Sequence, residues 1–113
     1  MSKHYSADNL TEIAGGDTDF IGVVAQTFLD EIPADLEAME EAVENDNKEL
    51  AYQFAHKMKP NLEMLGIDVL KEISAIEAWT RTSKSKSAIN ASVQKVSSIL
   101  QMVFGELRAD FDL

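Results

Sequence analysis

The chain has 113 residues, a length that fits one domain with a buried core, and 45% of them are hydrophobic, as in globular proteins. It contains no cysteine, which excludes disulfides and thiolate metal sites. Its net charge is −10, and residues 1–50 carry thirteen Asp and Glu against two Lys. Because phosphate binding requires a basic surface, nucleic acids and anionic membranes are poor partners, and other proteins are better ones.

The length of the chain favours a single domain spanning residues 1–113. The segment from Met1 to Ser6 has no apolar core of a secretory signal, and no apolar run approaches the ~18 residues of a membrane span. We therefore expect a cytoplasmic location. Met1 and the short tails suggest a free protein.

Residues that typically begin or end helices are clear in the first third of the chain. Ser6 is expected to cap a short helix that ends near Ala14, before Gly15 and Gly16. Asp17 is expected to cap a second helix. The apolar side chains of this second helix that should face the core are Phe20, Val24, Phe28 and Leu29.

Pro33 suits the first turn of a third helix, because the N–H that it lacks would have no partner there. Asp46 and Glu49 resemble a capping box that opens a fourth helix, and Gly66 is a good stop for it. The apolar side chains of the third helix recur at helical spacing, at Leu36, Met39 and Val43.

Two further helices complete the pattern. Asp68 is expected to start the fifth helix, and the polar stretch from Thr80 to Ser87 is expected to be a loop. The inward side chains of the fifth helix should be Leu70, Ile73, Ile76 and Trp79. Those of the long last helix should be Ile89, Val93, Val96, Leu100, Val103, Phe104 and Leu107. The expected fold is all-α, an antiparallel four-helix bundle with one or two additional short N-terminal helices.

His56 lies on the outer face of the expected fourth helix. At about 100° per residue, the apolar side chains of this helix fall in a stripe roughly 120° wide, and His56 lies about 170° from its centre. Tyr52, Lys59 and Glu63 share the outer face with it. We therefore expect an exposed imidazole. The apolar stripe consists of Leu50, Ala51, Phe54, Met58, Leu62 and Leu65.

An exposed histidine on a helix is usually an ordinary surface residue, but the neighbours of His56 favour chemistry. Lys57 and Lys59 accompany it in an otherwise acidic protein. Lys59, three residues further on, is a neighbour on the helix surface, where it would offset the ~1.5 to 2 negative charges of a phosphoryl group. A neutral imidazole is a usable nucleophile near neutral pH.

The segment from Ala55 to Gly66 resembles the signature of histidine-containing phosphotransfer (HPt) domains. That pattern is a His, any residue, an apolar residue, Lys and Gly, with a further Gly ten positions after the His. His56, Met58, Lys59 and Gly66 match it, whereas Pro60 stands where Gly is usual. The resemblance extends from about residue 8 to about residue 108. It includes the segments 15–17 and 28–33 and the acidic residues that follow them.

The resemblance implies a phosphorelay carrier and not an enzyme with its own turnover. His56 would accept a phosphoryl group, at Nε2, from a phospho-aspartate of a receiver domain and pass it to another response-regulator receiver. Lys59 would give electrostatic support, and Lys57 would be a weaker candidate for that role. The carrier would need no cofactor, because the magnesium ion belongs to the receiver. The implied partners are receiver domains and a hybrid sensor histidine kinase, and we expect a monomer.

Pro60 and the apolar neighbours of His56 bear on docking. Pro60 has no N–H for the carbonyl of His56, so we expect a local kink there. Its bulk, where Gly is usual, would tune the choice of receiver. The docking candidates are Leu10, Ile13, Gln53, Pro60 and Met64.

The sequence also bears on three other functions. A helical adaptor or inhibitor that binds a receiver or kinase without being phosphorylated remains the alternative, although such proteins typically lack the histidine. A histidine kinase is excluded because the five glycines form no phosphate-binding loop. A di-iron bundle needs Glu-x-x-His pairs, and the residue three before His56 is Gln53, so we expect no metal site.

Overall fold

The computed structural model describes residues 4–6 and 8–113, without the side chains of Asn9, Leu10 and Ile13. Helices follow one another through this part of the chain, with no strand between them, so the expected all-α fold is confirmed. The elements are α1 (Asp8–Ala14), α2 (Thr18–Glu44), α3 (Lys48–Met64), α4 (Leu70–Trp79), the 3-10 helix η1 (Lys86–Ala88) and α5 (Asn90–Phe111).

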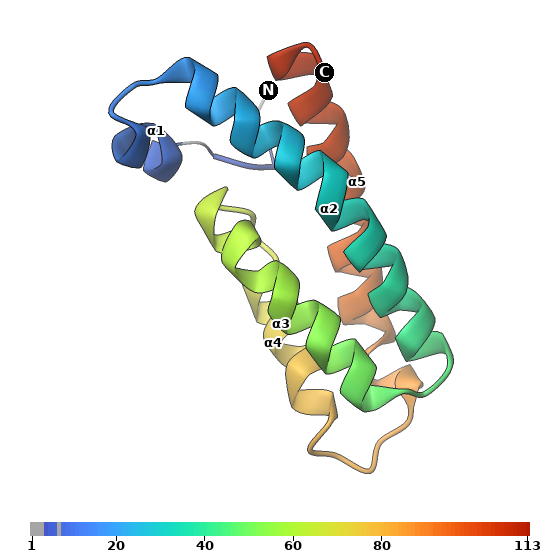
Figure 1. Cartoon of the computed structure of the whole chain (residues 1–113). Coiled ribbons are helices and arrows are strands. Elements are labelled where there is room, and N and C mark those ends of the chain that lie inside the picture. Colours follow the sequence, from blue (N-terminus) through green and yellow to red (C-terminus); the bar gives the residue numbers. More distant parts are fainter. Residues whose placement is uncertain (1–3, 7) are drawn as a thin grey trace.

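Helices α2 to α5 form the bundle. α2 packs on α3 and α5, α4 also packs on α3 and α5, and α1 packs on α2 (Figure 1). Helices that follow one another through the short links run in opposite directions. The expected four-helix bundle is therefore present, with one short N-terminal helix. Its largest fully buried side chains are Trp79, Ile32, Leu36, Met39, Met58, Leu62, Leu65, Ile67, Ile73, Ile76 and Leu100.

The expected helix start at Pro33 is wrong, because α2 continues through this residue from Thr18 to Glu44. An interior proline removes one helical hydrogen bond and costs roughly 3 kcal/mol. However, Phe28, Ile32 and Leu36 continue one buried stripe across Pro33. Each buried side chain of this kind contributes roughly 1.5–3 kcal/mol, so packing on both sides of the proline outweighs the lost bond.

The turn between α2 and α3 uses Asp46 differently from the expected capping box. Asp46 has a φ of 57° and ends α2, where its N–H donates to the carbonyl of Val43, while the N–H of Asn47 donates to the carbonyl of Ala42. This pair of bonds is a Schellman motif, with Asp46 at the left-handed position. Asn47 is the residue that caps α3, and its side chain accepts from the N–H of Leu50.

Three other details differ from the expected pattern. Phe20 is 44% exposed, because the buried stripe of α2 begins one residue later, at Ile21. Leu50, in the first turn of α3, is 37% exposed. Asp68 does not cap α4, which begins after Val69 without a side-chain cap.

The N-terminal segment fastens the turn after α3 to α5. Gly66 ends α3 in a Schellman motif at a φ of 58°, a conformation that favours glycine. The N–H of Ser6 donates to the carbonyl of Leu65 in this turn, at 2.6 Å. His4 Nδ1 lies 2.6 Å from Glu106 Oε2 on α5. The segment thus connects two helices at one end of the bundle.

The link between α4 and α5 is held by one long-range bond and one local bond. Lys48 Nζ donates to the carbonyl of Thr82 at 2.6 Å, and the indole N–H of Trp79 donates to the carbonyl of Lys84 at 3.0 Å. The expected loop is thus ordered by α3 and α4, and only its last residues enter η1. Among the described residues, no helix has the length and apolar character needed to cross a membrane.

Candidate functional site

His56 occupies the middle of α3, and its side chain is 65% exposed. The core stripe of this helix, which includes Ala55 and Met58 on either side in sequence, is fully buried. The helical phase that places these neighbours inside directs the imidazole outward. The prediction of an exposed His56 is therefore confirmed.

A carboxylate from the adjacent helix holds the imidazole. Glu77 lies on α4, and its side chain is only 10% exposed. Its Oε2 atom lies 2.9 Å from His56 Nδ1, and its Oε1 atom accepts from Lys59 Nζ at 3.1 Å. One buried carboxylate thus joins the histidine and the lysine of the sequence motif.

This contact determines which imidazole nitrogen is available. An ionised carboxylate is only an acceptor, so the proton of neutral His56 resides on Nδ1, where it is donated to Glu77. Nε2 then carries a lone pair, and no described residue hydrogen-bonds to it. The site therefore presents one nucleophilic nitrogen, on the exposed edge of the ring.

The ionisation of Glu77 is maintained by its two partners. Burial raises the pKa of this carboxyl group, but hydrogen bonds from His56 and Lys59 lower it more, and its pKa is lowered overall. Glu77 is therefore a carboxylate at neutral pH. Because Lys59 is joined to Glu77, it lies on the His56 face of α3, as the sequence predicts.

Tyr52, four residues before His56, also touches the imidazole. The two rings are stacked, with centroids 5.5 Å apart and an interplanar angle of 6°. Stacking restrains the plane of the imidazole, while the bond to Glu77 restrains its rotation in that plane. The ring is thus fixed from two sides, although it lies on the surface.

Lys57 has a different neighbour. Its Nζ atom lies 3.0 Å from Asp35 Oδ1 on α2, and the Asp35 side chain is only 8% exposed. A buried carboxylate needs a cationic or hydrogen-bonding partner. In this structure the lysine stabilises the α2–α3 contact, and it is directed to Asp35 and not to the Glu77 cluster.

The docking candidates lie on different parts of the surface. Gln53 and Pro60 are exposed on α3, whereas Met64 is half-buried. Met64 lines a hollow of about 160 Å³ between α2 and α3, together with the exposed Val23 and other side chains. The side chains of Leu10 and Ile13 lie outside the described residues.

Pro60 does not end α3, which continues to Met64. It supplies no N–H, so the carbonyl of His56 lacks the bond that a residue four positions further on usually gives. The expected kink stays a prediction.

Sequence reasoning missed Glu77 as a member of the site. The available signal was an acidic residue beside Ile76, four positions after Ile73, on the inward stripe of α4. A buried acid at such a position needs a partner. The partner itself depends on how α3 and α4 pack, which the pattern of one helix does not contain.

Among the described residues, no group of three or more His, Asp or Glu is placed to bind a metal ion. His56 and Glu77 are instead engaged with each other.

Comparisons with known proteins give one family. The family model described as "Hpt domain" matches residues 23–110, which is most of the chain and includes α3 and α4. No curated protein and no solved structure matches the chain.

Proposed function

Because this chain belongs to the Hpt domain family, whose members take part in phosphotransfer in two-component phosphorelays, we propose that it is a phosphohistidine carrier. In this proposal His56 accepts a phosphoryl group from a phospho-aspartate of one receiver domain and passes it to another. The observation that carries the proposal is the bond from His56 Nδ1 to Glu77, which leaves an exposed Nε2 lone pair.

The transfer needs no proton to be removed before attack. The Nε2 lone pair attacks the phosphorus of the acyl phosphate, a P–N bond forms, and the P–O bond to the aspartate breaks. The aspartate leaves as a carboxylate. Since Nδ1 keeps its proton, the imidazole ring becomes positively charged during the step, and the Glu77 carboxylate at 2.9 Å stabilises that charge. The reverse step uses the same groups.

Lys59 supplies positive charge beside the attacking nitrogen. Its ammonium group is bound to Glu77 at 3.1 Å, which keeps it on the His56 face of α3. A cation there attracts the phosphoryl oxygens and lowers the cost of bringing them to an acidic protein. We propose electrostatic support as its role, with Lys57 contributing to stability through Asp35.

Hpt domains are phosphocarriers rather than enzymes, and we propose that this one needs no cofactor of its own. The magnesium ion for the step would be supplied by the receiver domain. The proposed partners are receiver domains and a hybrid sensor histidine kinase, and the proposed location is the cytoplasm.

The receiver would dock on the face that surrounds His56. Gln53 and Pro60 are exposed on α3 near the histidine, and the hollow lined by Val23 and Met64 offers apolar surface between α2 and α3. On α3 this hollow is lined by Asn61 and Met64, five and eight residues after His56, and apolar surface of this kind is typical of the core of a protein interface. Pro60 would stiffen this face and tune the choice of receiver.

The test is the intact mass of the protein after mixing with a phosphorylated receiver, for the unchanged chain and for His56→Gln. We expect a gain of one acid-labile phosphoryl group, absent in His56→Gln. The matched control is His4→Gln, because the chain has two histidines and His4 is engaged with Glu106. A gain that survives His56→Gln, or no gain with a broad panel of receivers, would refute the carrier role. Receiver binding that survives His56→Gln in that case would favour an adaptor.

A further inference from the structure

The charge of the site is balanced before phosphorylation and unbalanced after it. Neutral His56, the Lys59 cation and the Glu77 carboxylate sum to zero. A phosphoryl group adds ~1.5 to 2 negative charges. Even when Nδ1 keeps its proton, so that the ring is positive, the phosphorylated site carries about one net negative charge. A further cation near Nε2 would reduce this surplus.

Most cations near the site already have partners. Lys57 is joined to Asp35 at 3.0 Å, and Lys48 donates to the carbonyl of Thr82 at 2.6 Å. Arg81, directly after the last turn of α4, is exposed, and no acidic group of the described residues lies within ion-pair distance of it. Its guanidinium is therefore available to another anion.

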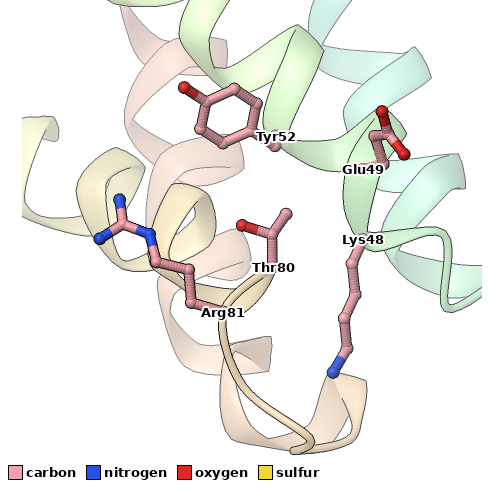
Figure 2. Close-up of a pocket in the computed structure, with 5 residues that line it drawn as sticks. All are labelled: Lys48, Glu49, Tyr52, Thr80 and Arg81. Carbon is pink, nitrogen blue, oxygen red and sulfur yellow. The ribbon is translucent and has the colours of Figure 1, made fainter.

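Arg81 lies in the turn that follows α4, four residues after Glu77, and its N–H donates to the carbonyl of Ala78. On α3, Tyr52 precedes His56 by four residues, which is one helical turn and about 5–6 Å. Because α3 and α4 are antiparallel, Tyr52 and Arg81 are displaced from His56 and Glu77 in the same direction along the contact between the two helices. Tyr52 and Arg81 line one recess of about 440 Å³ there (Figure 2).

The recess is connected to the imidazole through one of its lining side chains, Tyr52. Tyr52 forms one wall of it, and the same tyrosine ring is stacked on His56 at 5.5 Å. In Figure 2 the guanidinium of Arg81 and the hydroxyl of Tyr52 lie on the same side of the recess. Lys48 extends toward the opposite end of the view, and Glu49, the acidic residue of the lining, is directed away from Arg81.

We infer that Arg81 is the second cation of this site, and that it donates hydrogen bonds to the phosphoryl oxygens of phosphorylated His56 across the recess. The inference rests on the proposed function, because it requires His56 to be the acceptor. A guanidinium suits the role, since it stays charged and its forked donors match two phosphate oxygens. No bond to Arg81 forms or breaks, and its effect is electrostatic.

The experiment uses the protein without any receiver. The unchanged chain and the variants Arg81→Ala, Arg81→Lys and Arg108→Ala are phosphorylated with phosphoramidate. The donor is then removed, and loss of the phosphoryl group is followed by intact mass. The second readout is a ³¹P NMR titration of the phosphoryl group. Arg108 is a matched control, because it also lies exposed near the C-terminal end of a helix, α5.

We expect the Arg81→Ala phosphohistidine to decay about fivefold faster, which corresponds to roughly 1 kcal/mol of attraction between charges at 4 Å in water. The pKa of its phosphoryl group should rise, because the variant lacks the cation that stabilises the dianionic form. Arg81→Lys should restore part of both effects, and Arg108→Ala should leave both unchanged.

Other outcomes would overturn the inference. One is an Arg81→Ala phosphohistidine with the decay rate and titration of the unchanged chain. Another is an equal change in Arg108→Ala, which would indicate a general charge effect. Failure of the unchanged chain to be phosphorylated at His56 would instead refute the proposed function.

Discussion

Replacing Glu77 by Gln removes the negative charge that faces the imidazole while leaving a carbonyl oxygen that accepts from Nδ1. In the unchanged chain this carboxylate lies 2.9 Å from the ring nitrogen and is 10% exposed. Because Glu77 accepts from His56 through one oxygen and from Lys59 through the other, the substitution removes both the charge and one of these two accepted bonds. We expect transfer to slow because the ring gains positive charge during the attack.

The size of the effect follows from the surroundings of the pair. Two unit charges 4 Å apart attract by about 1 kcal/mol in water and by about 4 kcal/mol near a protein surface. His56 is 65% exposed and Glu77 is nearly buried, so an intermediate value of roughly 2 kcal/mol is appropriate. At 1.36 kcal/mol for each factor of ten, this predicts transfer slowed about 30-fold.

The assay is single-turnover transfer from a phosphorylated receiver, stopped by rapid quenching. Glu72→Gln is the matched control, because Glu72 lies on the same helix and its carboxylate pairs with Lys95 on α5 at 2.8 Å. This control removes an equivalent ion pair that does not touch His56. Both variants should be checked for folding by their unfolding midpoints in urea.

Two results would refute the reasoning. A Glu77→Gln transfer rate within about threefold of the unchanged chain would mean that the carboxylate charge contributes less than roughly 0.7 kcal/mol to the step. An equal loss in Glu72→Gln would mean that the effect comes from the stability of α4 and not from the imidazole.

Three further predictions concern stability and docking. Lys57→Ala should lower the free energy of unfolding in urea by about 1–2 kcal/mol, because it leaves the buried Asp35 carboxylate unpaired. It should leave the rate of transfer unchanged. A variant as stable as the unchanged chain would refute this prediction. Because the pKa of Glu77 is lowered in the folded state, its contribution to stability is complete above the usual Glu range and is lost as pH falls through the lowered pKa. In urea titrations between neutral pH and about pH 3, the free energy of unfolding should therefore fall less for Glu77→Gln than for the unchanged chain. An equal fall in both proteins would contradict this prediction. Pro60→Gly should leave phosphorylation of His56 by phosphoramidate unchanged while altering transfer rates to several receivers by different factors, and unchanged rates for all of them would remove the role in partner choice.

Predictions from the sequence succeed where one helix determines the answer. The outward phase of His56 follows from the apolar stripe of its own helix, and the stop at Gly66 follows from the conformational freedom of glycine. The core side chains of α5, such as Val96 and Leu100, follow from their spacing. In each case the residues that decide the outcome lie within a few positions of one another.

Predictions fail where two interactions compete or two helices meet. Pro33 has the local features of a helix start, but burial on both sides keeps α2 continuous. Asp46 has the features of a cap, but it adopts the left-handed conformation that ends α2 and leaves capping to Asn47. The bond between Glu77 and His56 crosses from α4 to α3 and depends on their packing.

The contact between Glu77 and His56 also makes reactivity a property of the folded chain. Glu77 lies 21 positions from His56, so a denatured chain contains the same imidazole without a fixed tautomer or a restrained ring. Separation of α4 from α3 would remove the bond that fixes the tautomer and would leave only the stacking on Tyr52, which lies on the same helix as His56. Under the proposed function, a partly unfolded copy would therefore lose the arrangement that transfer requires.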